Sequence, residues 1–362
     1  MRLKVTFPMP FLPRLRRSAL ALVVLVLARA GFLPAAAHAD QNTPMSPPPR
    51  SVERIDYQRW PDSLLLKNGL VEAVVVPAIG RVMQLRFSGE RDGPFWENPL
   101  LATRSAVADP NDWANFGGDK AWPSPQSDWD KNAGRAWPPP TGFDGGLMEA
   151  VIDGPAAVTL VSPIDAGYGI RVRRRIELSP DRPVMTVTTT YEKVAGAPLE
   201  VAVWVITQLK NPVAVGAPLA GASGKGSDYV SQSDGLPAGL HVADGLLSLA
   251  RDPRQNHKIG MRAATLVWVG ATESLRIDSA LVSGAKYPDD GCSAEVYTNA
   301  DPLAYVELEL LGPLARLEVG GRLERVSSYT LVRRADPDPK LEVRRLLAGE
   351  SGLPRTATER VP

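Results

Sequence analysis

Two strands joined by a turn are predicted from IRVRRRIELSPDRPVMTVTTTY at residues 170–191. Apolar and polar side chains alternate over 170–178 and again over 184–191, as in strands with one buried face, and proline and aspartate mark the turn between them. No helix of ordinary length is evident, so the sequence predicts an all-β chain that folds as a large antiparallel β-sandwich. Further strands are predicted over 70–76, 81–87, 199–207, 264–269, 295–298, 304–311 and 322–332.

The N-terminus has the order of features found in a secretory signal peptide. Arginines over 14–17 precede a short apolar run over 19–27, and small residues follow that end in AHA at 37–39. This order predicts export and cleavage after Ala39. The apolar run is shorter than the roughly 20 residues that a permanent transmembrane helix needs. We therefore expect a periplasmic or secreted protein with no membrane span after cleavage.

The charge of the mature chain argues against nucleic acid as a partner. Removing residues 1–39 takes away six of the 41 basic side chains and none of the 40 acidic ones, which leaves a net charge of about −5. A mildly acidic chain without basic runs lacks the positive surface that binds nucleic acid or anionic lipid. Sugars and other neutral or cationic partners stay open, and so does the oligomeric state.

Cysteine and histidine usage restricts the possible chemistry. Cys292 is the only cysteine, so no disulfide can form within the chain, and we expect it to be a buried apolar residue, with a reactive thiol as the alternative. The sequence has no H-E-x-x-H motif, no zinc-binding spacing and no phosphate-binding loop, and therefore predicts no metal and no cofactor. His241 is expected to be a structural residue in a strand, and His257 to lie in a loop.

Proline-rich and charged segments flank the predicted domain. Residues 40–58 contain four prolines and few apolar side chains, so they are predicted to form a linker. Residues 59–335 form the predicted sandwich. The tail over 336–362 alternates prolines with charges, and its leucines allow at most one short helix, so we expect it to lie outside the core domain.

Tryptophans are concentrated between residues 96 and 137, which hold five of the eight in the chain. Within this region, NFGGDKAWPSPQSDW at 115–129 is predicted to be a structured loop whose glycines permit close backbone approach. Sugar sites combine apolar ring faces with planar polar groups, which favours a sugar site here; the alternative is a small aromatic core at one end of the sandwich. The candidate binding residues are Asp119, Lys120, Trp122, Gln126, Trp129 and Arg135.

Several motifs resemble those of the galactose-mutarotase-like superfamily. LKNGLVEAVVVPAIGRVMQLRFSGERDGPFWENP at 66–99 and GGDKAWPSPQ at 117–126 are similar to the strands and glycine-rich loop that open such a domain. CSAEVYTN at 292–299, YVELELLGPL at 305–314 and LEVGGRLERVSSYTL at 317–331 resemble later strands of aldose 1-epimerases. The motifs GGDKxWPxPQ and AEVYTN are most similar to a bacterial domain-of-unknown-function family, DUF4380.

This resemblance covers roughly residues 60–333 and implies a galactose-mutarotase-like supersandwich. It also implies the chemistry of aldose epimerases, in which a glutamate and a histidine exchange protons with the sugar. The strand that carries the family's glutamate matches at Glu309. Near the strand at 201–212, where the acid histidine is expected, this sequence has Trp204 and Gln208, which become candidate substrate-binding residues.

Three glutamates are candidate catalytic residues. Glu307 and Glu309 lie two positions apart in one predicted strand, so their side chains share a face. Glu295 lies two residues before Tyr297, a candidate binding residue in another strand. Neighbouring carboxylates can take unequal pKa values and divide acid from base work. If the face points into solvent, the glutamates are simply hydrated. Lys286, in the turn KYPDDG at 286–291, is a candidate binder for sugar hydroxyls or carboxylates, and a solvated turn is the alternative.

Three functions are consistent with these observations. The first is an extracytoplasmic carbohydrate-binding protein. The second is a carbohydrate-active enzyme, either epimerase-like or a glycosidase or lyase that uses paired carboxylates. The third is a non-catalytic interaction module of the cell envelope, whose tryptophans are buried or form a flat exposed patch.

Overall fold

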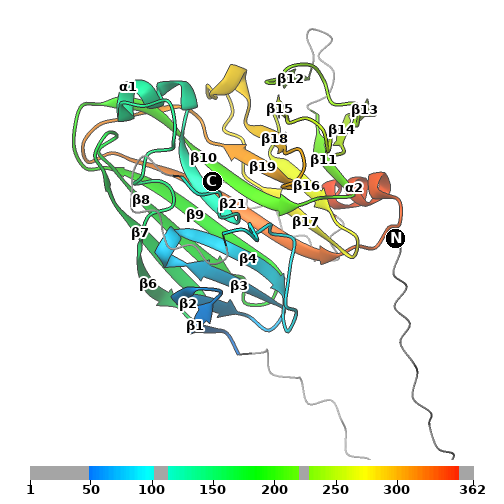
Figure 1. Cartoon of the computed structure of the whole chain (residues 1–362), viewed down its shortest axis with the longest axis horizontal. Helices are drawn as coiled ribbons and strands as arrows, with labels where there is room; N and C mark the ends of the chain where they lie inside the picture. Colours follow the sequence, from blue (N-terminus) through cyan, green and yellow to red (C-terminus); the bar gives the residue numbers. More distant parts are fainter. Residues whose placement is uncertain (1–48, 102–112, 220–227, 350–362) are drawn as a thin grey trace, which may run out of the picture. The chain divides into compact units, whose positions relative to one another are not determined.

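The computed structural model describes residues 49–101, 113–219 and 228–349. The predicted signal peptide, residues 40–48 of the predicted linker and residues 350–362 of the tail lie outside these ranges. Within the described ranges the strands form two large antiparallel sheets (Figure 1). This arrangement confirms the predicted all-β sandwich, and every strand predicted from the sequence is present, with ends that differ by at most three residues.

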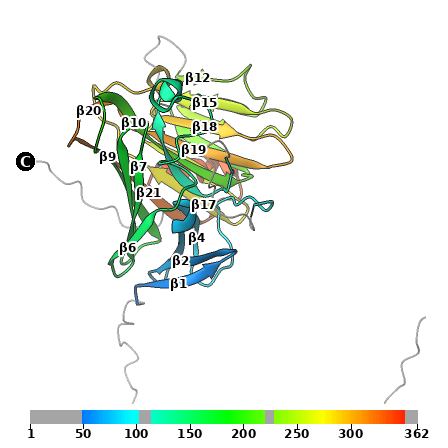
Figure 2. The same ribbon diagram turned by 60° about the vertical axis from the view of Figure 1, so that its left-hand side comes forward.

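The first sheet contains eleven of the described strands, and β10 lies near its middle. Figure 2 shows β10, β19, β18 and β15 side by side, as their pairing requires. In spatial order the strands are β1 (Ser51–Tyr57), β2 (Trp60–Lys67), β3 (Val71–Val76), β4 (Arg81–Phe87), β5 (Asp119–Ser124), β10 (Leu199–Lys210), β19 (Tyr305–Leu311), β18 (Ala294–Thr298), β15 (His257–Met261) and β12 (Tyr229–Ser231), with β20 (Ala315–Leu317) paired to β10.

The second sheet contains the other ten described strands. Its long central strands are β21, β9 and β8, which include the two strands of 170–191 that the sequence predicted first. In spatial order the strands are β13 (Leu240–Ala243), β14 (Leu246–Leu249), β11 (Ala214–Pro218), β16 (Thr265–Val269), β17 (Glu273–Asp278), β21 (Arg322–Arg333), β9 (Val184–Lys193), β8 (Ile170–Leu178), β7 (Ala157–Asp165) and β6 (Glu149–Gly154).

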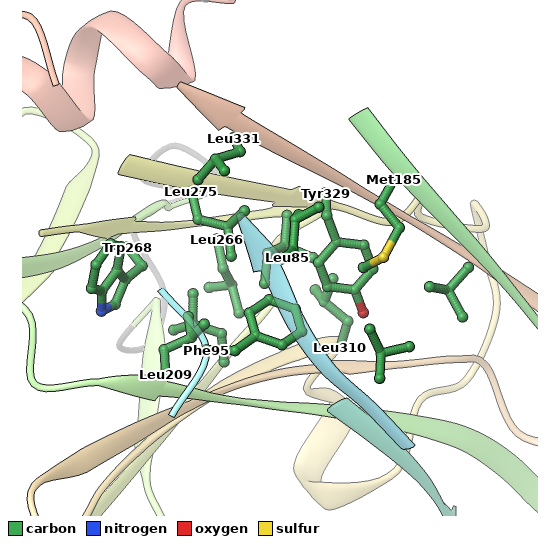
Figure 3. Close-up of a cluster of buried hydrophobic side chains, with 14 of the residues drawn as sticks. Leu85, Phe95, Met185, Leu209, Leu266, Trp268, Leu275, Leu310, Tyr329 and Leu331 are labelled. Carbon is green, nitrogen blue, oxygen red and sulfur yellow. The ribbon is translucent and has the colours of Figure 1, made fainter. Parts of the chain in front are cut away.

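The main hydrophobic core lies between the two sheets. Leu209 and Leu310 from the first sheet belong to the same buried cluster as Leu275, Tyr329 and Leu331 from the second (Figure 3). In strands with one buried face every second side chain contributes to such a core, so the intervening residues of β10, β18 and β19 point away from the second sheet. That opposite face carries the candidate site.

Both ends of the domain differ from the predicted boundaries. β1 lies inside the predicted linker and pairs with β2 along its length. In the predicted tail, helix α2 (Pro339–Leu347) buries Val343 and Leu346 against valines of β16, while Leu341 stays exposed. Apolar residues spaced three apart on one helix face account for this packing, so the helix is part of the domain.

The segment over 119–124 was predicted to be a loop and is instead strand β5. It pairs with β10 from Asp119 to Ser124 but meets β4 only through Asp119. A proline at position 123 is therefore tolerated, because no second ladder runs along that part of the strand. Before the strand, Gly117 has a φ of +94°, and a Cβ there would lie 2.2 Å from the Trp96 carbonyl oxygen. The predicted close backbone approach is thus present at this glycine.

Two helices are found among the described residues, α1 (Trp129–Ala133) and α2, together with 3-10 turns at Pro77–Ile79, Gln126–Asp128 and Asp289–Gly291. Neither helix has the length and apolar character needed to cross a membrane.

Candidate functional site

Strand register gathers a set of polar and aromatic side chains on one face of the first sheet. Residues directly opposite each other in an antiparallel pair share a face. Trp204 of β10 is opposite Trp122 of β5, and Gln208 is opposite Glu307 of β19. The register continues through β18 into β15. We call this face the polar face; its residues are Lys120, Trp122, Trp204, Gln208, Lys258, Glu295, Tyr297, Tyr305, Glu307 and Glu309.

Lys258 forms the centre of one charged group. Its Nζ lies 2.6 Å from Glu295 Oε2 and 3.0 Å from Glu309 Oε2, and it sits 4.5 Å from the centre of the Trp204 ring. The indole N–H of Trp204 donates to Glu309 Oε2 at 2.7 Å, and the amide of Gln232 donates to Glu295 Oε1 at 2.7 Å. Two carboxylates and an aromatic ring therefore hold this ammonium in place.

Lys120 belongs to a second group beside the first. Its Nζ lies 4.7 Å from the centre of the Trp122 ring and 3.6 Å from Glu307 Oε1. The amide of Gln208 donates to the same Glu307 oxygen at 2.8 Å. Within the described ranges, Lys120 Nζ, Trp122 Nε1 and Gln208 Oε1 are buried without a hydrogen-bond partner. Buried polar atoms are nearly always paired, so these three are suited to a ligand or to bound water.

Tryptophan rings surround Trp122 at the end of the polar face. The rings of Trp113, Trp129, Trp137 and Trp204 all lie within 6.3 Å of it, centre to centre. Trp137 is 49% exposed, whereas Trp122 is nearly buried. Further along the face, the ring of Trp96 stacks on Tyr305 at 4.4 Å. The polar groups are thus bordered by aromatic surface, part of which reaches solvent.

A buried ion pair orients one of these rings. Arg81, at the start of β4, pairs with Asp144, and both side chains are fully buried. The other oxygen of Asp144 accepts from the indole N–H of Trp113 at 2.9 Å. Arg81 also donates to the Gly117 carbonyl at 2.7 Å, next to the start of β5. The pair therefore connects the tryptophan cluster to the strand that carries Lys120.

Burial alters the acid–base properties of the polar face. Burial raises the pKa of Glu309 well above its usual range, although Lys258 opposes the shift. Burial lowers the pKa of Lys120, and the neighbouring Glu307 only partly compensates. Burial works against the charged form of Lys258 too, but the carboxylates of Glu309 and Glu295 raise its pKa, so that ammonium stays charged. Burial also raises the pKa of Tyr297 to about 12, which keeps its hydroxyl protonated.

Asp119 was predicted to bind substrate, and the structure corrects this. Because β5 is a strand, Asp119 points to the opposite side from Lys120, into the space between the sheets. There it is fully buried, pairs with Arg174 and accepts hydrogen bonds from Thr207 at 2.7 Å and Tyr329 at 2.6 Å. It is a structural residue of the core.

Four other candidates also lie away from the polar face. Trp129 is fully buried, and its indole N–H donates to the Pro123 carbonyl. It therefore belongs to a small aromatic core, which was the predicted alternative to a sugar site. Arg135 donates to carbonyls of its own loop. Gln126 is exposed in a 3-10 turn. Lys286 is 78% exposed and its Nζ lies 3.9 Å from Glu200 Oε1. It therefore agrees with the alternative given for it, a residue in a solvated turn.

Lys258 of the polar face, and two residues that contact this face, were not found from the sequence. Lys258 lies in β15, whose five residues give too short an alternation to stand out. Trp137 was noted as part of the tryptophan region but not as a binding residue, and Gln232 reaches Glu295 from an edge of the sheet. A lysine alternating with apolar neighbours in HKIGM at 257–261 was the one available signal.

The histidines and the cysteine do not contribute to the polar face. His257 was expected in a loop but begins strand β15, where it is buried on the side opposite Lys258. His241 lies in strand β13, as expected, but its side chain is exposed. Cys292 is buried, as predicted. In the described part of the chain, no group of three or more His, Cys, Asp or Glu side chains is arranged to hold a metal ion.

Comparisons with known proteins agree with the observed fold. Residues 62–327 match a family described as a domain of unknown function, DUF4380. A galactose mutarotase-like protein from Clostridium acetobutylicum is 11% identical, with a TM-score of 0.53 over 79% of this chain and 99% of that one. A galactose mutarotase-like protein from Lactobacillus casei is 10% identical, with a TM-score of 0.52 over 74% and 99%. A search of the curated proteins finds no match. At these identities the structural similarity concerns the fold.

Proposed function

We propose that this chain, which belongs to the DUF4380 family, is an extracytoplasmic protein that binds a carbohydrate on its polar face. The observation that carries the proposal is the set of three unpartnered buried atoms at neighbouring positions: Lys120 Nζ, Trp122 Nε1 and Gln208 Oε1. Two are donors and one is an acceptor, which matches a sugar hydroxyl, since it both donates and accepts.

The surroundings of these atoms support a sugar over other small molecules. Binding sites for small molecules are mainly apolar, with a few placed polar groups, and here indole rings border the charged groups. Trp137 offers exposed ring surface next to Trp122. The two solved structures named as galactose mutarotase-like have the same fold, which adds to the case for a sugar.

The test is a titration of the mature chain, residues 40–362, with mono- and oligosaccharides. Tryptophan fluorescence monitors binding. We expect saturable quenching by the bound sugar. The affinity should be about tenfold or more lower in Trp122→Phe, because the variant loses the indole N–H and part of the ring at the centre of the site. Trp268→Phe is the matched control, since Trp268 lies in the core between the sheets and donates to the Lys210 carbonyl. Absence of binding across a broad panel would contradict the proposal and favour an interaction module.

A second candidate, an acid–base enzyme acting on sugars, is favoured by Glu309. It is buried, its pKa is raised, and it lies beside a charged lysine; a raised pKa favours the protonated carboxyl, which a general acid requires. Neither described histidine lies on this face, so the acid would have to be another residue. Polarimetry of anomer exchange distinguishes the two functions: acceleration lost in Glu309→Gln indicates an enzyme, and binding without acceleration indicates a binding protein.

The cellular location is tested separately. We expect the protein in the periplasmic or culture fraction, with a mature N-terminus at Asp40, as the signal-like N-terminus predicts. N-terminal sequencing of the fractionated protein would show this, and an intact N-terminus in the cytoplasmic fraction would contradict the export proposal while leaving sugar binding untouched.

A further inference from the structure

We infer that the polar face selects a sugar that carries a carboxylate, such as a uronic acid, and that Lys120 is the residue that recognises it. This inference rests on the proposed function, since it specifies the class of sugar bound at the same site. Its basis is a comparison of the two lysines that lie on this face.

The two lysines share an indole ring as a neighbour but differ in the carboxylates that pair with them. Each ammonium lies over an indole ring, at 4.5 Å for Lys258 and 4.7 Å for Lys120. Lys258 contacts two carboxylates, Glu295 and Glu309, at 2.6 and 3.0 Å. Lys120 has one carboxylate, Glu307, at 3.6 Å, beyond the length of a normal hydrogen bond. Among the described residues, no second carboxylate lies within ion-pair distance of Lys120.

Burial makes this missing partner costly. The Lys120 side chain is 1% exposed, and its Nζ has no hydrogen-bond acceptor in the described part of the chain. A buried cation without full pairing is unfavourable, and burial accordingly lowers the pKa of this amine. A ligand carboxylate placed against Nζ would satisfy the ammonium and stabilise its charged form.

The charge of the site favours a single negative charge over a phosphate. The other ammonium on the polar face, Lys258, is already paired with two carboxylates. One incompletely paired lysine can balance one carboxylate, whereas a phosphate dianion commonly requires several cationic or backbone donors. The glutamates nearby would repel the additional charge.

The experiment compares ligands that differ only in this group. The probes are galacturonic and glucuronic acid and their trisaccharides, each against its neutral methyl ester, with glucose 6-phosphate as a further arm. We expect the free acids to bind the mature wild-type chain about tenfold or more tightly than the esters, as a charged hydrogen bond implies. This preference should weaken with salt and as pH rises through the pKa of Lys120, because only the ammonium attracts the carboxylate.

Variants assign the preference to Lys120. Lys120→Gln should weaken acid binding more than ester binding, so that the preference for acid over ester disappears, whereas Lys286→Gln, which removes an exposed lysine elsewhere, should keep it. If Lys120→Gln does not fold, Glu307→Gln gives an independent test: removing the competing carboxylate should strengthen acid binding relative to ester binding.

The outcomes separate the inference from the proposed function. Equal binding of acid and ester by the wild type, tighter binding of the phosphate than of the acids, or an acid preference that survives in a folded Lys120→Gln variant would each overturn the inference, while sugar binding would stand. If neither acids, esters nor neutral sugars bind, the proposed function fails, and the inference fails with it.

Discussion

Asp119→Asn should destabilise the protein strongly without removing sugar binding. Asp119 is fully buried between the sheets and pairs with Arg174, whose side chain is 1% exposed. It also accepts hydrogen bonds from Thr207 and Tyr329. The asparagine is nearly the same size, so the substitution removes the negative charge and leaves the guanidinium of Arg174 buried without its counter-ion.

The expected loss follows from these contacts. Breaking a buried ion pair by removing one partner costs about 3–5 kcal/mol, mainly because a charge remains buried and unpaired. A domain with a free energy of unfolding of about 5–15 kcal/mol would lose a large part of it. Tyr329→Phe, which removes one hydrogen bond to the same carboxylate, should cost about 1.5–3 kcal/mol. Asp153→Asn is the matched control, because its ion pair with Arg175 is partly exposed, and exposed pairs contribute about 1 kcal/mol or less.

The assay is urea unfolding of the mature chain and of each variant at pH 7, followed by circular dichroism and extrapolated linearly to water. Sugar titration under native conditions then tests the site itself. A loss in Asp119→Asn no greater than that in Asp153→Asn would refute the structural role of Asp119. Unchanged stability with abolished sugar binding would instead support the original prediction that this residue binds substrate.

Three further outcomes are expected. Lys258→Met removes the ammonium that opposes the raised pKa of the buried Glu309, so the folded-state pKa of Glu309 should rise further. A carboxyl whose folded-state pKa is raised loses stability as pH rises towards that pKa, so the gap in unfolding free energy between variant and wild type should widen between pH 5 and 8, and a constant gap would contradict this. Burial raises the pKa of Cys292 to about 12, so iodoacetamide should alkylate it at pH 8 only after unfolding, and rapid labelling of the native protein would show an accessible thiolate. Leu346→Ala, on the buried face of α2, should lower the free energy of unfolding in urea by about 2–5 kcal/mol. Leu341→Ala, on the exposed face, should change it by no more than about 0.5 kcal/mol. Equal losses would show that the helix is not packed as described.

Local alternation predicted nine of the described strands, but not others such as β2 and β7. Segments such as 170–178 and 184–191 alternate over their whole length, and both are strands of the second sheet. The pattern failed where it was short or interrupted. The strand β5 contains Pro123 and follows two glycines, and β15 has five residues. In both places local composition favoured a loop, while pairing with a long neighbouring strand produced a strand.

The error at β5 changed the predicted site. Adjacent residues in a strand point to opposite faces, so Asp119 and Lys120 cannot both line one site once the segment is extended. Treating it as a loop allowed both to be assigned to sugar binding. Glu307 and Glu309 were placed on one face correctly, because their strand was recognised.

The sequence by itself determined the fold class, nine of the 21 described strands and the family, since these depend on local periodicity and on short motifs. Only the tertiary structure decided which strands are neighbours, because pairing depends on burial summed over segments far apart in the chain. It placed Lys258 between Glu295 and Glu309, and Lys120 beside Glu307 with one partner fewer. That difference between two lysines arises from strand register, so no local pattern around either residue could have revealed it.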